Sequence, residues 1–178
     1  MHSNKIISNA YHDIGKKKSI ILCIEELAEL NSAILSMVSS KKYENHLCEE
    51  IADVEIHIEY IKKILKISSK QIRKSSKDQF DKKSMSYDGY SISFMPLLSK
   101  EKLYLTTVNE IAELITHLTK YLRGKPRNKK KIIKSIAAVE IYIDEILERE
   151  KIGRKKVKSW TKKKQKRLKH RVKKHKVF

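Results

Sequence analysis

Apolar residues recur at intervals of three, four and seven in two early segments of the chain, the pattern of a single buried stripe on an amphipathic helix. The first segment runs from Lys18 to about Val38 and the second from Leu47 to Leu65, with the polar break SSKKYEN between them. The pattern predicts two consecutive helices that form an antiparallel hairpin. The stripes consist of Ile20, Ile24, Leu27, Ile34 and Val38, and of Leu47, Ile51, Val54, Ile58, Ile61 and Leu65.

The second half of the chain resembles the first. EELAEL at 25–30 has a counterpart in NEIAEL at 109–114, and EEIADVEI at 49–56 has one in KSIAAVEI at 134–141. Both counterparts follow their partners at nearly the same offset, since position 25 corresponds to 109 and position 49 to 134. Two matches at nearly one spacing indicate an internal duplication of the hairpin. We therefore expect an all-α antiparallel bundle made of two duplicated helical hairpins.

The chain divides into four parts on this basis. Residues 1–67 hold the first hairpin with its complete acidic motif, and 99–150 hold the second. Between them, 68–98 is expected to be a polar linker with a short helix at its start, since it is rich in Ser and Lys and contains the turn signal Asp88-Gly89. Residues 151–178 should form a basic C-terminal helix or tail.

Charge is distributed unevenly. The last part, 151–178, holds 15 of the 41 Lys and Arg residues and none of the 21 acidic ones, in a chain of net charge +20. Such a block predicts attraction to polyanions: nucleic acid, nucleotide phosphates or an anionic surface. The N-terminal residues lack the apolar core of a secretory signal, and no run of about 18 apolar residues predicts a membrane span. We expect a cytoplasmic protein that does not enter a membrane.

Four carboxylates carry the candidate chemistry. Glu26 and Glu29 lie on the face of the first helix opposite the Ile20 stripe, while Glu50 and Asp53 line the flank of the stripe on the second. A single E-x-x-E is more often a solvated helix face, but pairing of these two helices would bring all four acids into one cleft. Anions packed so closely need protonation or a counter-charge, and hard oxygen ligands suit Mg²⁺, or Mn²⁺ in its place.

E-x-x-E followed some twenty residues later by E-x-x-D, on consecutive amphipathic helices, resembles the hallmark of the MazG-like and dimeric dUTPase superfamily of all-α nucleoside triphosphate pyrophosphohydrolases. Gly15 stands ten residues before Glu25, as in small MazG-like proteins, and the resemblance covers about residues 11–65. It implies Mg²⁺-dependent cleavage of an NTP or dNTP between the α and β phosphates, which yields a nucleoside monophosphate and pyrophosphate.

The resemblance also assigns roles. It implies that Glu26, Glu29, Glu50 and Asp53 are metal ligands, with Glu25 or Glu49 as the base or an outer-shell group. Ser19 occupies the position where the family often has a glutamine near the base pocket. The stretch SWTKKKQKRLKHRV at 159–172 looks like the late helix that closes the family's site. Its candidate phosphate ligands are Lys163, Lys166 and Arg167.

The second repeat retains only part of the motif. Ser135 and Ala138 stand at the positions that match Glu50 and Asp53, although Glu110 and Glu113 remain. We expect one active site per chain, with the second hairpin serving as the partner that family members obtain by dimerising. The chain would then be a pseudo-dimer, and such chains could also associate further into a homodimer. A further alternative function is a non-catalytic nucleic-acid-binding or interaction module that uses the basic tail.

Overall fold

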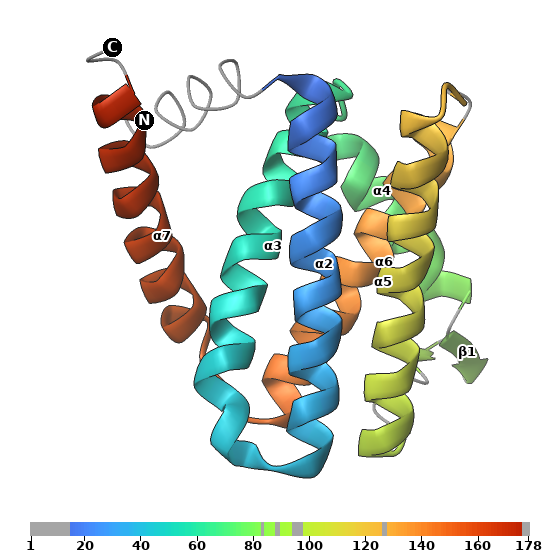
Figure 1. The fold of residues 1–178 in the computed structure, drawn as a ribbon. Helices are drawn as coiled ribbons and strands as arrows, with labels where there is room; N and C mark the ends of the chain where they lie inside the picture. Colours follow the sequence, from blue (N-terminus) through green and yellow to red (C-terminus); the bar gives the residue numbers. More distant parts are fainter. Residues whose placement is uncertain (1–14, 83, 88–89, 94–97, 126–127, 176–178) are drawn as a thin grey trace.

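The computed structural model describes residues 15–82, 84–87, 90–93, 98–125 and 128–175. It is a bundle of helices with one short antiparallel hairpin attached (Figure 1), and the prediction of a helical fold is confirmed for these residues. Within the described ranges, no helix combines the length and the apolar composition that crossing a bilayer needs. The helices are α2 (Lys16–Ser39), η1 (Lys41–Tyr43), α3 (Glu44–Ile64), α4 (Ser69–Lys82), α5 (Lys100–Leu122), α6 (Lys129–Arg149) and α7 (Arg154–His175); the strands are β1 (Ser84–Tyr87) and β2 (Tyr90–Ser93).

One apolar core joins both halves of the chain. The α2 stripe is buried at Ile20, Leu27 and Ile34, whereas Val38, at the end of the helix, is 47% exposed. α2 packs against α3 and also against α5, which in turn packs against α6. Burying one such aliphatic side chain contributes about 1.5–3 kcal/mol, so this shared core holds the two hairpins together.

Helix boundaries repeat along the chain with the spacing of the sequence motifs. α2 and α5 begin at positions 16 and 100, α3 and α6 at 44 and 129, and α4 and α7 at 69 and 154, so the three pairs share nearly one offset. The turns after α3 and α6 also match. Lys66 and Lys151 both adopt a left-handed conformation, with φ of 51° and 58°. The correspondence therefore extends to a third helix in each half.

The third helix of each half, α4 or α7, packs on the hairpin of the other half. α4 follows the first hairpin but packs on α6 of the second, and α7 follows the second hairpin but packs on α3 of the first. Ile72 in α4 and Val157 in α7 occupy corresponding positions of the two halves, and both are buried. Figure 1 shows α7 as the outer helix beside α3. Each hairpin is thus covered by a helix that the other half supplies.

Residues 68–98, the segment expected to be a polar linker with a short helix, contain the 14-residue helix α4 and the β1–β2 hairpin. α4 begins at a capping box: the Gln71 backbone N–H donates to the Ser68 hydroxyl at 3.2 Å, and the Ser68 N–H donates to Gln71 Oε1 at 2.8 Å. The Gln79 side chain donates to the Lys134 carbonyl at 2.9 Å and ties the helix to α6. A mainly polar segment is therefore part of the bundle.

The two left-handed lysines offer a test of the repeated turn. Lys66→Gly and Lys151→Gly should each raise the melting temperature, because glycine lacks the Cβ that makes this conformation costly by about 1 kcal/mol. The exposed residue Lys162, in the middle of α7, is the control: Lys162→Gly should lower stability by about 1 kcal/mol. Thermal unfolding followed by circular dichroism would measure all three. A loss of stability at positions 66 and 151 would contradict the turn geometry.

Candidate metal centre

The packing of α2 against α3 brings acidic side chains from both helices together. One carboxylate oxygen from each of Glu26, Glu29 and Glu50 can be chosen so that all three lie within 4.8 Å of one another. Asp53 lines the same cleft as Glu26 and Glu29. The four acids predicted to meet at the hairpin interface are therefore neighbours in the structure. They differ in exposure, from the exposed Glu29 to Glu50 at 6%.

Burial and mutual repulsion make two of these acids unusually weak. Burial, then the charges of Asp53 and Glu29, raise the pKa of Glu26 to about 7. The same three causes raise the pKa of Glu50 to about 7. Glu50 Oε1 lies 3.3 Å from His46 Nδ1, but the buried Oε2 atom has no hydrogen-bond partner among the described residues. A buried carboxylate oxygen without a donor is costly and suited to accepting a cation.

Lys164 of α7 supplies the positive charge closest to the acids. Its Nζ donates to Asp53 Oδ2 at 2.5 Å and lies 2.7 Å from Glu49 Oε1. Burial lowers the pKa of Lys164, but the hydrogen bonds to Asp53 and Glu49 outweigh that effect and raise it overall. For Asp53, burial raises the pKa while Lys164 opposes the rise. Lys164 thus stays protonated and neutralises part of the cluster.

The acids open onto a cleft of about 270 Å³ between the first hairpin and α7. His57 lines it, with Nε2 3.6 Å from Glu26 Oε1. Because burial lowers the pKa of His57 to about 4, its ring is neutral near pH 7 and does not offset the negative charge. On the α7 side the lining residues are Lys164, Arg167 and Leu168. The cleft therefore has an acidic wall and a basic wall.

The other predicted site residues lie at different places. Glu49 is half-buried at the edge of the cluster through its pair with Lys164. Glu25 is exposed and does not line the cleft. Ser19 is fully buried and donates its hydroxyl to the Gly15 carbonyl at 2.9 Å. Lys163 lies over the Trp160 ring, 4.3 Å from its centroid, and Lys166 is exposed and outside the cleft lining.

Of the predicted α7 cations, then, only Arg167 lines the cleft, and Lys164 was overlooked between two candidates. A signal for it existed in the spacing. Lys164 follows the buried Val157 by two helical turns and so projects from the same face of α7 toward α3. Lys163 and Lys166 are turned about 100° and 160° away from Lys164 around the helix axis and so lie off that face.

The donor set fits a hard divalent cation. All four candidate ligands are carboxylates, and Mg²⁺ prefers an octahedral shell of oxygens at about 2.1 Å, in which the oxygens are roughly 3–4 Å apart. The oxygens of Glu26, Glu29 and Glu50, within 4.8 Å of one another, would reach such a shell by small side-chain rotations. The unpaired Glu50 Oε2 would gain a partner.

The corresponding positions of the second half do not carry this arrangement, although Glu110 and Glu113 match Glu26 and Glu29. At the repeat position that corresponds to Glu49 it has Lys134, at Glu50 Ser135, at Asp53 Ala138, and at Lys164 the neutral Gln79. The cation and the acids it would neutralise are absent together. This paired difference indicates that Lys164 belongs with the acidic cluster and not with a general basic surface.

Comparison of the chain with models of protein families, with curated proteins and with solved structures finds no significant match. The residues of the site and the motif that they form are therefore what indicates a function.

The acidic cluster should make the metal-free protein less stable as the pH rises. Because folding raises the pKa of Glu50 from 4.5 to about 7, the folded chain holds a proton that the unfolded chain releases between these values. The free energy of unfolding thus falls from about pH 4.5 to 7. At pH 8, Glu50→Gln should be more stable than wild type by on the order of 2 kcal/mol, or about 4–8 °C.

Thermal unfolding in EDTA from pH 5 to 8 measures this difference. The exposed Glu148, on α6, provides the control: Glu148→Gln should follow the wild-type curve. A Glu50→Gln variant that is less stable than wild type at pH 8 would show that the Glu50 carboxylate is satisfied in the metal-free chain.

Proposed function

We propose that the chain is a divalent-metal-dependent nucleoside triphosphate pyrophosphohydrolase with its active site in the cleft between the first hairpin and α7. The observation that carries the proposal is the convergence of four acids from two helices around a buried carboxylate oxygen without a donor. The motif that these acids form resembles that of MazG-like enzymes. Mg²⁺ is the proposed resident ion, with Mn²⁺ as a substitute.

Glu26, Glu29, Glu50 and Asp53 would hold the metal. The bound ion would neutralise phosphate oxygens and lower the pKa of a coordinated water. In the proposed reaction a water oxygen would form a bond to the α phosphorus while the bond from that phosphorus to the α–β bridging oxygen breaks, and pyrophosphate would leave. Glu49, half-buried beside the cluster, is the proposed acceptor of the water's proton. Glu25 is less well placed, since it is exposed outside the cleft.

The basic wall has a part in the same scheme. Lys164 and Arg167 face the acids across the cleft, so a triphosphate between the two walls would meet cations on the side away from the metal ligands. Fixed cations stabilise the charge that develops on phosphate oxygens during in-line displacement. In the absence of substrate, Lys164 instead occupies Asp53 and Glu49. On binding, the phosphates would become the partners of Lys164, and the metal would become the partner of Asp53.

We further infer that the chain is an internal duplication of a three-helix unit, with one active half and one degenerate half. The equal spacing of helix starts, the two left-handed turns and the reciprocal packing of α4 and α7 support it. The second unit contributes α7 to the site of the first. The chain would thereby contain within itself the partner that a dimeric enzyme recruits.

A panel of NTPs and dNTPs with Mg²⁺ or Mn²⁺ tests the activity, by release of monophosphate and pyrophosphate. Glu50→Gln and Asp53→Asn should each lose at least about a hundredfold in turnover, because a hydrolytic metal site is intolerant of a lost ligand. Glu110→Gln, the counterpart of Glu26 in the other half, should retain activity. No hydrolysis of any nucleotide by the folded wild type would reject the proposal.

Lys164 should compete with the metal for Asp53. Lys164→Gln removes the competing cation and leaves the cluster more negative, so the affinity for Mn²⁺ should rise severalfold while turnover falls. Lys163→Gln, which alters the neighbouring exposed lysine, should leave the affinity within about twofold. Calorimetric titration with Mn²⁺ in the absence of nucleotide measures both. Weaker binding by Lys164→Gln would mean that Lys164 supports the ion site.

A nucleic-acid interface is the second candidate function, favoured by the basic outer surface of α7. At least six lysines of this helix are exposed, and the cations of its inner face are already engaged by α3. Binding to phosphates through such lysines would weaken steeply with salt. A wild type that is inactive on every nucleotide but binds an oligonucleotide in this salt-dependent way would favour the second candidate. The lysines of α7 described as exposed are Lys155, Lys158, Lys162, Lys163, Lys166 and Lys169.

A further inference from the structure

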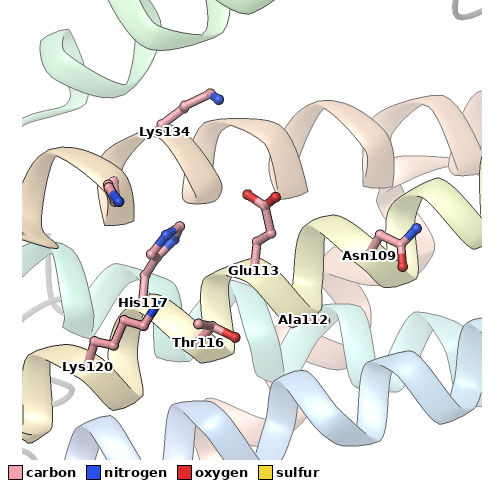
Figure 2. Close-up of a pocket in the computed structure, with 8 residues that line it drawn as sticks. Asn109, Ala112, Glu113, Thr116, His117, Lys120 and Lys134 are labelled. Atoms are coloured by element: carbon pink, nitrogen blue, oxygen red, sulfur yellow. The ribbon is translucent and has the colours of Figure 1, made fainter.

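The degenerate half has a groove of its own, between α5 and α6, of about 810 Å³ (Figure 2). This volume is within the range of small-molecule sites, about 300–1,000 Å³. In Figure 2 the side chains of Glu113 and His117 project from α5 toward α6, which carries Lys134. The described lining residues are Asn109, Ala112, Glu113, Thr116, His117, Lys120, Lys131 and Lys134.

The side chains that line this groove are mainly positive, whereas the cleft of the first half has a wall of carboxylates. Lys120, Lys131 and Lys134 line the groove together with one carboxylate, that of Glu113, and Lys131 and Lys134 also border the neighbouring groove between α4 and α6. Lys131 and Lys134 correspond to His46 and Glu49, which flank the acidic cluster in the first half. Two positions beside the proposed cation ligands of one half therefore carry lysines in the other. The groove suits an anion.

A neutral, fixed imidazole lies among these lysines. Nδ1 of His117 is 2.9 Å from the Ser135 hydroxyl, and Ser135 is only 2% exposed. Burial, and then the nearby lysines, lower the pKa of His117 although Glu113 opposes them. The Ser135 hydroxyl is buried away from the groove and thus serves to orient the ring. His117, Asn109 and Thr116 add hydrogen-bonding groups to the charges of the lysines.

We propose that the α5–α6 groove binds the phosphate chain of a small polyphosphate-bearing molecule through Lys120, Lys131 and Lys134, and does not hydrolyse it. Ammonium groups on two helices can reach different phosphates of one chain. Hydrolysis is not expected, since Ser135 and Ala138 replace two of the acids of the first half. The proposal is independent of the enzymatic one, because it needs neither the acidic cluster nor a metal.

Calorimetric titration of the full chain with inorganic triphosphate in EDTA is the test. Without metal, the acids of the first cleft repel the probe, and the lysine variants then separate binding in the α5–α6 groove from binding elsewhere on the basic surface. Wild type should bind one triphosphate, and the double variant Lys120→Gln/Lys131→Gln, which includes the lysine that lines only this groove, should bind at least about tenfold more weakly, since hydrogen bonds to charged groups contribute a factor of this order or larger. ATP as a second probe, if tighter than triphosphate, would identify a nucleotide as the ligand.

The matched control is Lys74→Gln/Lys130→Gln, which removes the same charge from the neighbouring groove between α4 and α6. It should weaken triphosphate binding by less than about threefold. Absence of saturable binding to wild type would overturn the proposal. So would an equal loss in the two double variants, which would show a diffuse lysine surface of the kind that binds any polyanion.

Discussion

Repulsion among the carboxylates at the α2–α3 interface is the constraint around which the first half of the chain is arranged. Apolar stripes bring the two helices together, and the same register brings Glu26, Glu29, Glu50 and Asp53 into one partly buried place. Two of these acids respond with a pKa near 7. The rest of the charge is balanced from outside the hairpin, by Lys164, and this explains why a helix from the far end of the chain packs here.

The cleft is formed by parts of both halves, because each third helix packs on the hairpin of the other half. α7 belongs by sequence to the second half but packs on the first, and α4 does the reverse. Arg154 and Lys156 at the start of α7 pair with Glu55 and Glu44 of α3 and align the two helices before Lys164 reaches Asp53. The cleft therefore exists only when both halves are folded. The second half, which lacks the complete acidic motif, thus still builds one wall of the cleft.

Much of this arrangement could be predicted from the sequence, since it depends on local periodicity. The expected helices from Lys18 to about Val38 and from Leu47 to Leu65 match α2 and α3 within a few residues. A short helix was expected at the start of 68–98, but periodicity could not predict the length of α4 or its packing, which depends on Ile72 and Gln79 meeting a distant helix. The capping box at Ser68 was the local signal of its start. Lys164 was missed similarly, because its importance depends on which face of α7 meets α3.

Anomalous diffraction from crystals soaked in Mn²⁺ would test the central claim most directly, because it locates the ion without reference to activity. The account predicts a peak within coordination distance of Glu26, Glu29 and Glu50, with Lys164 displaced from Asp53 and no peak between α5 and α6. Crystals with no peak at the acidic cluster, and with the Lys164–Asp53 pair intact, would show that α7 alone neutralises the acids and that the cleft is not a metal centre.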